Sequence, residues 1–254
     1  MPPAALALPL QEVHVWRAAL EEHAPSIPQL QPLLSPEEVS RAEKFYFARD
    51  RDHFLISHGL LRVILGQYTG VEAAALRFSR NAYGKPALAN TPIEMDLRWN
   101  LSHSGQWALY AVARGREVGV DVEQFRNVAD VDRIVERFFA PRERAEFGSL
   151  PPGRRTEGFF ALWTLKEAYI KGVGRGLSLP LDQFHVSPIA GESRRFCACA
   201  GHAGESGEWT LEPLAVAPQY AAAVAAEGRD WQLACWECTP AVLSKRLSGH
   251  DASL

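Results

Sequence analysis

Residues 159–174 read Phe-Phe-Ala-Leu-Trp-Thr-Leu-Lys-Glu-Ala-Tyr-Ile-Lys-Gly-Val-Gly, and we predict that they form one helix. Strong helix formers fill the middle, and Gly172 and Gly174 follow the last lysine, where a helix is expected to end. An apolar stripe recurs at helical spacing: Phe159, Leu162, Leu165, Ala168 and Tyr169. Glu167 and Lys171 are neighbours on one helix face. Taken alone, such a pair is most often a surface ion pair.

The segment Val-Gly-Val-Asp-Val-Glu at residues 118–123 predicts a strand because it is rich in β-branched residues. Its period of two places Asp121 and Glu123 on one face and the valines on the other. Two adjacent carboxylates repel each other unless a cation lies between them, and Mg²⁺ is a natural partner for such oxygens. A solvated polar face explains an isolated Asp-x-Glu equally well.

Taken together and in this order, the two segments resemble the Sfp-type 4′-phosphopantetheinyl transferases. That family carries Gly-(Val/Ile)-Asp-(Val/Ile)-Glu and, some forty residues later, Trp-(Ser/Thr)-x-Lys-Glu-(Ala/Ser). Here residues 119–123 read Gly-Val-Asp-Val-Glu and residues 163–168 read Trp-Thr-Leu-Lys-Glu-Ala, with Gly-Leu-Ser-Leu-Pro-Leu following at residues 176–181. The resemblance implies an α+β fold with two similar α/β subdomains related by a pseudo-twofold axis.

The resemblance also implies a reaction. The 4′-phosphopantetheine arm of coenzyme A would pass to a serine of an acyl or peptidyl carrier protein, and 3′,5′-ADP would leave. Asp121, Glu123 and Glu167 would bind Mg²⁺ on the diphosphate. Glu167 is the first choice for the base that accepts the serine proton, and Lys171 would meet the phosphate charge.

Glu143 is the alternative base. It ends the segment Phe-Phe-Ala-Pro-Arg-Glu at residues 138–143, which matches a family segment whose glutamate has been proposed for that role. A glutamate that faces solvent in the first helical turn after Pro141 fits the same sequence. By the same resemblance, Lys166 would add positive charge near the phosphates.

The N-terminal part of the chain carries a candidate ligand for the 3′-phosphate of coenzyme A. Arg49 lies in a Phe-x-Arg-Asp setting that the family places against this phosphate, and a guanidinium suits bidentate binding. Without the resemblance, solvated charge beside Asp50 and Asp52 would be the preferred interpretation of this arginine. Arg41 and Lys44 are weaker candidates, because Glu38 stands where some relatives carry a lysine.

Two further motifs point to the nucleotide. Lys85 lies in Tyr-Gly-Lys-Pro at residues 83–86, which the family uses to hold the nucleotide end of coenzyme A, although a plain turn fits the tripeptide as well. Ser102 and His103 lie in Asn-Leu-Ser-His-Ser, a family motif that contacts the phosphates. A serine hydrolase is disfavoured because neighbours in sequence seldom face each other and no Gly-x-Ser-x-Gly elbow is present.

Composition limits the classes of function. The chain has 254 residues, of which 47% are hydrophobic and 22% charged, so it can bury one large core or two similar small ones. A net charge of −3 gives no general attraction to nucleic acid. No apolar run is long enough to span a membrane, and the proline-broken N-terminus lacks a basic leader, so we expect a cytoplasmic protein.

The four cysteines are expected to be ordinary reduced residues rather than a zinc site. Cys197 and Cys199 lie in a Cys-x-Cys pair, and Cys235 and Cys238 are three residues apart. On a strand the second pair would face opposite sides, which spoils the ligand geometry. No glycine-rich knuckle accompanies either pair.

We divide the chain into an N-terminal subdomain for nucleotide binding at residues 1–118, a C-terminal subdomain for magnesium and catalysis at residues 119–240, and a tail at residues 241–254. A weak repeat between residues 106–113 and 219–225 fits two similar halves. The resemblance implies that coenzyme A lies in a cleft between the two halves. Because one chain supplies both halves, we expect a monomer to form the whole cleft.

Two competing functions share some of these features. A magnesium-dependent nuclease or phosphatase would use the same acidic cluster, but it would not need basic residues far upstream for a nucleotide 3′-phosphate. A binder of carrier protein or coenzyme A without catalysis would keep the fold, although occupation of every expected acidic position argues against it.

Overall fold

The two halves of the chain repeat one topology, strand, long helix and two-stranded hairpin. The structure is a computed structural model and describes residues 6–92, 95–188, 195–199 and 208–248. The first half is built from β1 (Glu12–Ala19), α3 (Ala48–Thr69), β4 (Leu97–Ser104) and β5 (Trp107–Arg114). The second half is built from β6 (Val118–Gln124), α6 (Arg155–Val173), β9 (Trp209–Pro213) and β10 (Tyr220–Glu227).

The strand order confirms the predicted duplication. The first sheet has the order β11-β1-β5-β4 and the second β6-β10-β9-β8-β7, so in each half the last strand of the hairpin lies between the other two. The weak sequence repeat falls on β5 and β10, which occupy equivalent central positions. The fold is therefore α+β with two similar subdomains, as predicted.

Shorter elements complete the described chain, with single 3-10 turns between some of them. They are α1 (Ile27–Leu30), α2 (Pro36–Ala42), β2 (Phe78–Arg80), β3 (Pro86–Leu88), α4 (Val131–Phe138), α5 (Pro141–Gly148), β7 (Phe184–Pro188), β8 (Arg195–Cys199), β11 (Gln232–Glu237) and α7 (Pro240–Ser248). Within the described residues, every helix is too short or too polar to cross a membrane.

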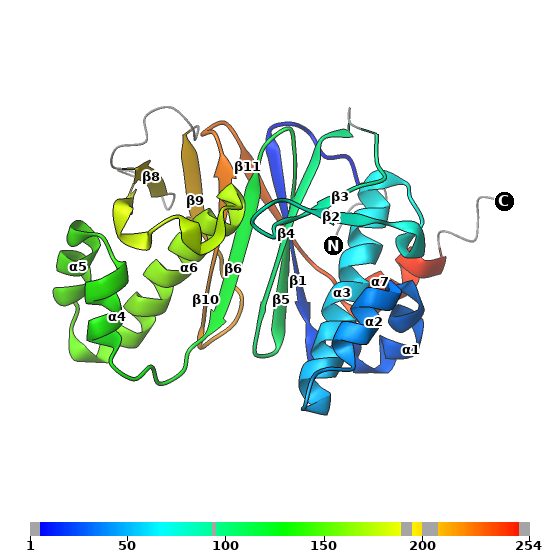
Figure 1. Cartoon of the computed structure of the whole chain (residues 1–254), viewed down its shortest axis with the longest axis horizontal. Helices are drawn as coiled ribbons and strands as arrows, with labels where there is room; N and C mark the ends of the chain where they lie inside the picture. The colour runs from blue at the N-terminus through cyan, green and yellow to red at the C-terminus, as the bar shows by residue number, and fades with distance from the viewer. Residues whose placement is uncertain (1–5, 93–94, 189–194, 200–207, 249–254) are drawn as a thin grey trace.

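The helices and the two sheets stack in layers with hydrophobic cores between them, and Figure 1 shows α3 and α6 on opposite flanks with the strands between them. The alternation of side chains along each strand divides the cores. Val13 and Val15 of β1 face the second sheet together with the valines of β6, whereas Trp16 and Ala18 face α3. The third core lies between α6 and the second sheet.

The end of the chain returns to the first half. β11 pairs in parallel with β1, from Glu12 opposite Gln232 to Arg17 opposite Glu237. Leu243 of α7 is buried in the same core as Trp16. Residues 232–248 therefore pack with the first half, whereas the predicted division assigns them to the second subdomain and the tail.

Local signals explain how several helices begin and end. Ser35 and Glu38 form a capping box at the start of α2, with Pro36 in the first turn. Pro141 begins α5 and separates it from α4. Helix α6 ends at Gly174, whose left-handed backbone (φ +71°) is the usual glycine stop.

Gly119 allows α6 to lie directly against β6. A Cβ atom at this position would lie 2.1 Å from the carbonyl oxygen of Ala168 and 2.3 Å from the amide nitrogen of Gly172. Both are backbone atoms of α6 and cannot move aside alone. The glycine in the Gly-Val-Asp-Val-Glu motif is therefore needed for close packing between the strand and the helix.

We predict that Gly119→Ala lowers the free energy of unfolding by about 1–3 kcal/mol, the usual cost of overpacking. Chemical denaturation followed by circular dichroism measures this change. Gly148→Ala is the control, because a Cβ at residue 148 would meet no atom within 4 Å. Equal stability of both variants would show that α6 does not depend on the small residue.

Candidate functional site

The edges of the two sheets meet through side chains rather than through a backbone ladder. Three side chains at alternate positions of β4 accept hydrogen bonds from alternate amides of β6: Asn100 Oδ1 from Val120 (2.9 Å), Ser102 Oγ from Val122 (3.4 Å) and Ser104 Oγ from Gln124 (3.1 Å). We call this contact the β4–β6 seam. It joins the halves and fixes the register of β6 against β4.

Hydroxyls of the seam also hold the predicted acidic residues. Ser102 Oγ donates to Asp121 Oδ1 (2.9 Å), and Ser104 Oγ donates to Glu123 Oε2 (3.1 Å). Lys171 Nζ on α6 donates to Asp121 Oδ1 (2.6 Å) and to Ser102 Oγ (2.9 Å). The seam therefore brings the strand acids and the helix lysine into one cluster, as the sequence predicts.

The acidic side chains of the cluster lie close together although their like charges repel each other. Burial, opposed by Lys171, raises the pKa of Asp121. Burial and the charge of Asp121 raise the pKa values of Glu123 and Glu167. Asp121 is only 3% exposed, and its Oδ2 has no hydrogen-bond partner among the described residues. An orphaned carboxylate oxygen beside two more acids fits a cation.

The three acids do not, however, form a finished metal site. Among residues 6–92, 95–188, 195–199 and 208–248, no group of three His, Cys, Asp or Glu side chains is arranged to hold a metal ion. The predicted convergence of Asp121, Glu123 and Glu167 on one point is thus not seen. The Lys171 ammonium satisfies Asp121 Oδ1 in this arrangement.

An open cavity of about 820 Å³ lies on the other side of β4. Its walls come from α2, α3, the β2–β3 hairpin and β4. Arg41, His58, Arg80 and His103 bring basic side chains to it. The Arg41 guanidinium lies 5.2 Å from the ring centre of Phe54, and the imidazole of His58 stacks on the same ring at 4.0 Å. The cavity thus combines positive charge with aromatic surface.

His103 lines the cavity and is surrounded by basic groups. Burial, followed by the charges of His58 and Lys171, lowers the pKa of His103 to about 4. The charges of these neighbours would attract an anion to this end of the cavity.

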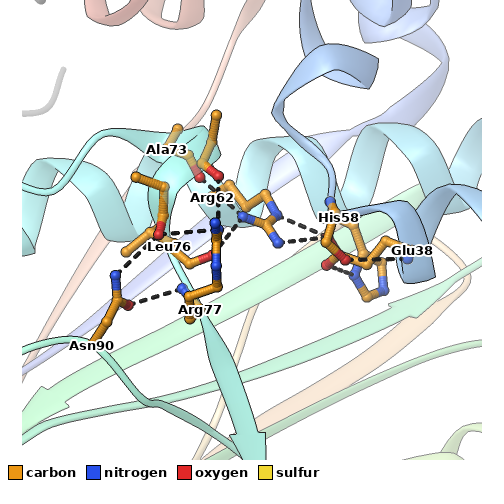
Figure 2. A network of polar contacts seen from close by, with 10 residues as sticks. Glu38, His58, Arg62, Ala73, Leu76, Arg77 and Asn90 are labelled. Atoms are coloured by element: carbon orange, nitrogen blue, oxygen red, sulfur yellow. Dashed lines mark hydrogen bonds and ion pairs between the residues drawn. The ribbon is translucent and has the colours of Figure 1, made fainter.

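Glu38 braces the wall of the cavity (Figure 2). Its carboxylate accepts hydrogen bonds from His58 (3.2 Å), from Arg62 Nε (2.9 Å) and from the amide of Ser35 (2.8 Å). Burial would raise its pKa, but these bonds together lower the pKa of Glu38 to about 2. Glu38, which stands where some relatives carry a lysine, therefore stays ionised and ties α2 to α3.

Figure 2 also shows Arg62 bonded to the backbone of the segment that leads from α3 to β2. Its Nη1 donates to the carbonyl oxygens of Ala73 and Leu76, both at 3.0 Å. Its guanidinium carbon lies 5.0 Å from the ring centre of Phe78 on β2. These contacts of Arg62 therefore support the β2–β3 hairpin, which forms another wall of the cavity.

Two predicted nucleotide ligands do not face this cavity. Arg49 lies at the exposed start of α3, pairs with Glu21 at 3.4 Å and is outside the cavity lining. The amine of Lys85 points away from the cavity, toward Glu117 and the end of α6. Of the predicted ligands, His103 lines the cavity, while Ser102 belongs to the acidic cluster behind it.

Glu143 and Lys166 lie together in the interior of the second half. They form a buried ion pair (2.7 Å), with side chains 1% and 0% exposed. Glu143 also accepts hydrogen bonds from the amides of Ala140 and Val186, and Lys166 donates to the carbonyl oxygen of Phe184. These bonds hold α5, α6 and β7 together and leave neither group facing the acidic cluster.

Sequence reasoning missed His58, Arg77 and Arg80 as cavity residues. Arg80 follows Phe78 by two positions on β2, so both lie on one strand face, and this spacing was a usable signal. His58 gave no signal, because its position depends on how α3 packs. Arg41, considered a weak candidate, lines the cavity in place of Arg49.

The site thus consists of a cavity with basic and aromatic side chains on one side of β4 and an acidic cluster on the other. Two family models match the chain: the 4′-phosphopantetheinyl transferase superfamily over residues 117–225 and the N-terminal part of 4′-phosphopantetheinyl transferase over residues 15–114. The chain belongs to the 4′-phosphopantetheinyl transferase family, and its enzyme class is that of a transferase.

Relatives agree with this assignment. The chain is 36% identical over 234 residues to the 4′-phosphopantetheinyl transferase HetI of Nostoc sp., covering 92% of this chain and 95% of HetI. It is 33% identical over 153 residues to the 4′-phosphopantetheinyl transferase Sfp of Bacillus subtilis, covering 60% and 66%. A holo-(acyl-carrier-protein) synthase from Bacillus anthracis in complex with CoA (3′,5′-ADP) shows a partial likeness, with 20% identity, a TM-score of 0.37 and coverage of 43% and 93%.

We predict that Lys166→Met lowers the free energy of unfolding by about 3–5 kcal/mol, because the buried carboxylate of Glu143 loses its counter-ion. Urea denaturation followed by circular dichroism measures the loss. Arg154→Met is the control, since it breaks an exposed ion pair with Glu157 (side chains 66% and 53% exposed) and should change stability by less than about 1 kcal/mol. If Lys166→Met kept its stability but lost activity, the result would contradict a purely structural role and indicate that Lys166 takes part in the reaction.

Proposed function

We propose that the protein transfers the 4′-phosphopantetheine arm of coenzyme A to a serine of an acyl or peptidyl carrier protein, in a Mg²⁺-dependent reaction that releases 3′,5′-ADP. One observation carries this proposal. Adjacent residues of β4 face two different sites: His103 lines the basic cavity, and Ser102 bonds Asp121 and Lys171 of the acidic cluster. A ligand with a phosphorylated nucleotide and a diphosphate matches that pair of neighbouring sites.

The nucleotide end of coenzyme A is assigned to the cavity. Arg41 offers a guanidinium for the 3′-phosphate, and His58 and His103 add hydrogen-bond donors nearby. Phe54 offers an aromatic face, although Arg41 and His58 lie close to its ring. An anion beside His103 would raise the lowered pKa of this imidazole and so allow it to take up a proton.

Asp121, Glu123 and Glu167 would hold Mg²⁺ on the diphosphate. The unpartnered Oδ2 of Asp121 and the raised pKa values of all three acids support a cation there. When bound, the ion would neutralise charge on the diphosphate oxygens. Lys171 would then move from Asp121 to a phosphate oxygen, a short step for a flexible ammonium that is about one-third exposed.

The chemistry is a displacement at phosphorus. The carrier serine oxygen bonds to the phosphorus that bears pantetheine, the bond from this phosphorus to the bridging oxygen breaks, and 3′,5′-ADP leaves with that oxygen. Glu167 takes the serine proton, because its carboxylate lies on α6 one helical turn from Lys171, beside the acidic cluster. Lys171 stabilises the charge that builds on the phosphate oxygens. Positioning supplies most of the catalysis in such reactions.

We predict that Asp121→Asn, which keeps the shape but removes the charge, reduces transfer by at least about a hundredfold. Intact mass of a carrier protein incubated with coenzyme A and Mg²⁺ measures the transfer. Wild-type protein should also gain thermal stability from Mg²⁺ alone, and the variant should not. Full activity of a folded Asp121→Asn protein would remove the acidic cluster from the reaction and leave a nucleotide binder.

Arg41→Ala should weaken binding of 3′,5′-ADP by about ten- to a hundredfold, the usual loss for one charged hydrogen bond. Isothermal titration calorimetry measures it. Arg49→Ala is the matched control, because its guanidinium is exposed and lies outside the cavity lining. If Arg49→Ala weakens binding and Arg41→Ala does not, the 3′-phosphate lies where the sequence first predicted.

A further inference from the structure

The β2–β3 hairpin touches two places at once. Its strands line the basic cavity through Phe78, Arg80 and Pro86. The residues that close the hairpin reach the end of α6: Asn81 Nδ2 donates to the carbonyl oxygen of Gly174 (3.0 Å), and Lys85 Nζ donates to that of Gly172 (2.5 Å). A single short hairpin therefore links the cavity to the helix that carries Glu167 and Lys171.

These contacts provide hydrogen-bond donors for the backbone carbonyl groups at the end of α6. The last carbonyl groups of a helix have no partner within the helix, and a cation near them also interacts favourably with the helix dipole. Here both the cation and the amide donor come from the other half of the chain. Gly174 lets Lys85 approach, since a Cβ atom at residue 174 would lie 2.5 Å from Lys85 Cδ.

The Lys85 amine is fully used by these neighbours. An ammonium has three donors, and the acceptors present are Glu117 Oε2 (2.5 Å), the carbonyl oxygen of Gly172 (2.5 Å) and that of Val118 (3.4 Å). The side chain is 13% exposed. Binding a phosphate would require Lys85 to give up a carboxylate and a helix end.

Glu117 extends the link to β4 and β6. Its Oε2 bonds Lys85, its Oε1 accepts from Arg98 Nη1 on β4 (2.8 Å), and it directly precedes β6. Burial lowers the pKa of Lys85, and the charge of Glu117 opposes this. The hairpin, α6, β4 and the start of β6 thus meet at one largely enclosed lysine, Lys85.

We propose that Lys85 is a positioning residue, which ties the nucleotide-side hairpin to the end of α6 and so aligns Lys171 and Glu167 with a ligand bound in the cavity. Gly172, which Lys85 holds, directly follows Lys171 in the chain. The hairpin cannot shift without pulling on this last turn. The inference rests on the proposed function, because alignment matters only if α6 acts on a ligand held by the hairpin.

The test compares Lys85→Met with wild-type protein and with Lys245→Met, which replaces an exposed lysine on α7. Three quantities are measured: kcat and KM for coenzyme A, the dissociation constant for 3′,5′-ADP, and hydrogen exchange in residues 165–174. We expect kcat of Lys85→Met to fall by about tenfold or more, because misplacement of catalytic groups is costly. Exchange in residues 165–174 should rise, and binding of 3′,5′-ADP should change by less than about threefold, as no ligand contact is lost. Lys245→Met should behave as wild type.

Glu117→Gln is the second variant and keeps the test decisive if Lys85→Met does not fold. It leaves Lys85 in place but removes its counter-charge, so kcat should fall and exchange should rise in the same direction. The opposite split, weak nucleotide binding with normal kcat and unchanged exchange, would overturn the proposal and make Lys85 a phosphate ligand. If wild-type protein transfers nothing, the proposed function fails, whereas unchanged exchange in both variants would refute the link between the hairpin and α6 itself.

Discussion

The β4–β6 seam is the contact on which the site depends. A backbone ladder between the two edges would use the amides of β6 but bring no side-chain hydroxyl between the sheets. Here asparagine and serine side chains accept from those amides, and Ser102 and Ser104 then donate to Asp121 and Glu123. The same bonds that join the halves thus orient the acids. Because the side-chain period of a strand is two, a slip of one residue in β6 would turn both acids away from β4.

Burying the acidic side chains beside the β4–β6 seam costs electrostatic free energy. Burial raises the pKa of Asp121, and burial together with the charge of Asp121 raises the pKa values of Glu123 and Glu167, so the folded protein holds charges that an ordinary core would exclude. Lys171 offsets part of this at Asp121 Oδ1 and leaves Oδ2 without a partner. The buried pair of Glu143 and Lys166 shows the contrast, since all its oxygens and its amine are satisfied. Perturbed and incompletely satisfied groups mark a working site, whereas satisfied groups mark structure.

Rules that act within one element predicted much of this arrangement. They placed the end of α6 near Gly174 and both strand acids on one face. They failed where a side chain finds partners far along the chain. Lys85 bonds residues 32 and 87 positions away, and Glu143 bonds residues 23 and 43 positions away. A motif fixes which residue stands at a position, but packing of other elements decides which way its side chain points.

The duplication itself explains why the site arose at this seam. Each half has a three-stranded unit, β1-β5-β4 or β6-β10-β9, and each unit has two edges that need partners. The edge at β1 is covered by β11 and the edge at β9 by β8, which leaves β4 and β6 facing each other. These two strands are not equivalent in the repeat, since β4 corresponds to β9 and β6 to β1. The pseudo-twofold symmetry is therefore broken at their contact, and one chain presents a basic cavity on one side of β4 and an acidic cluster on the other.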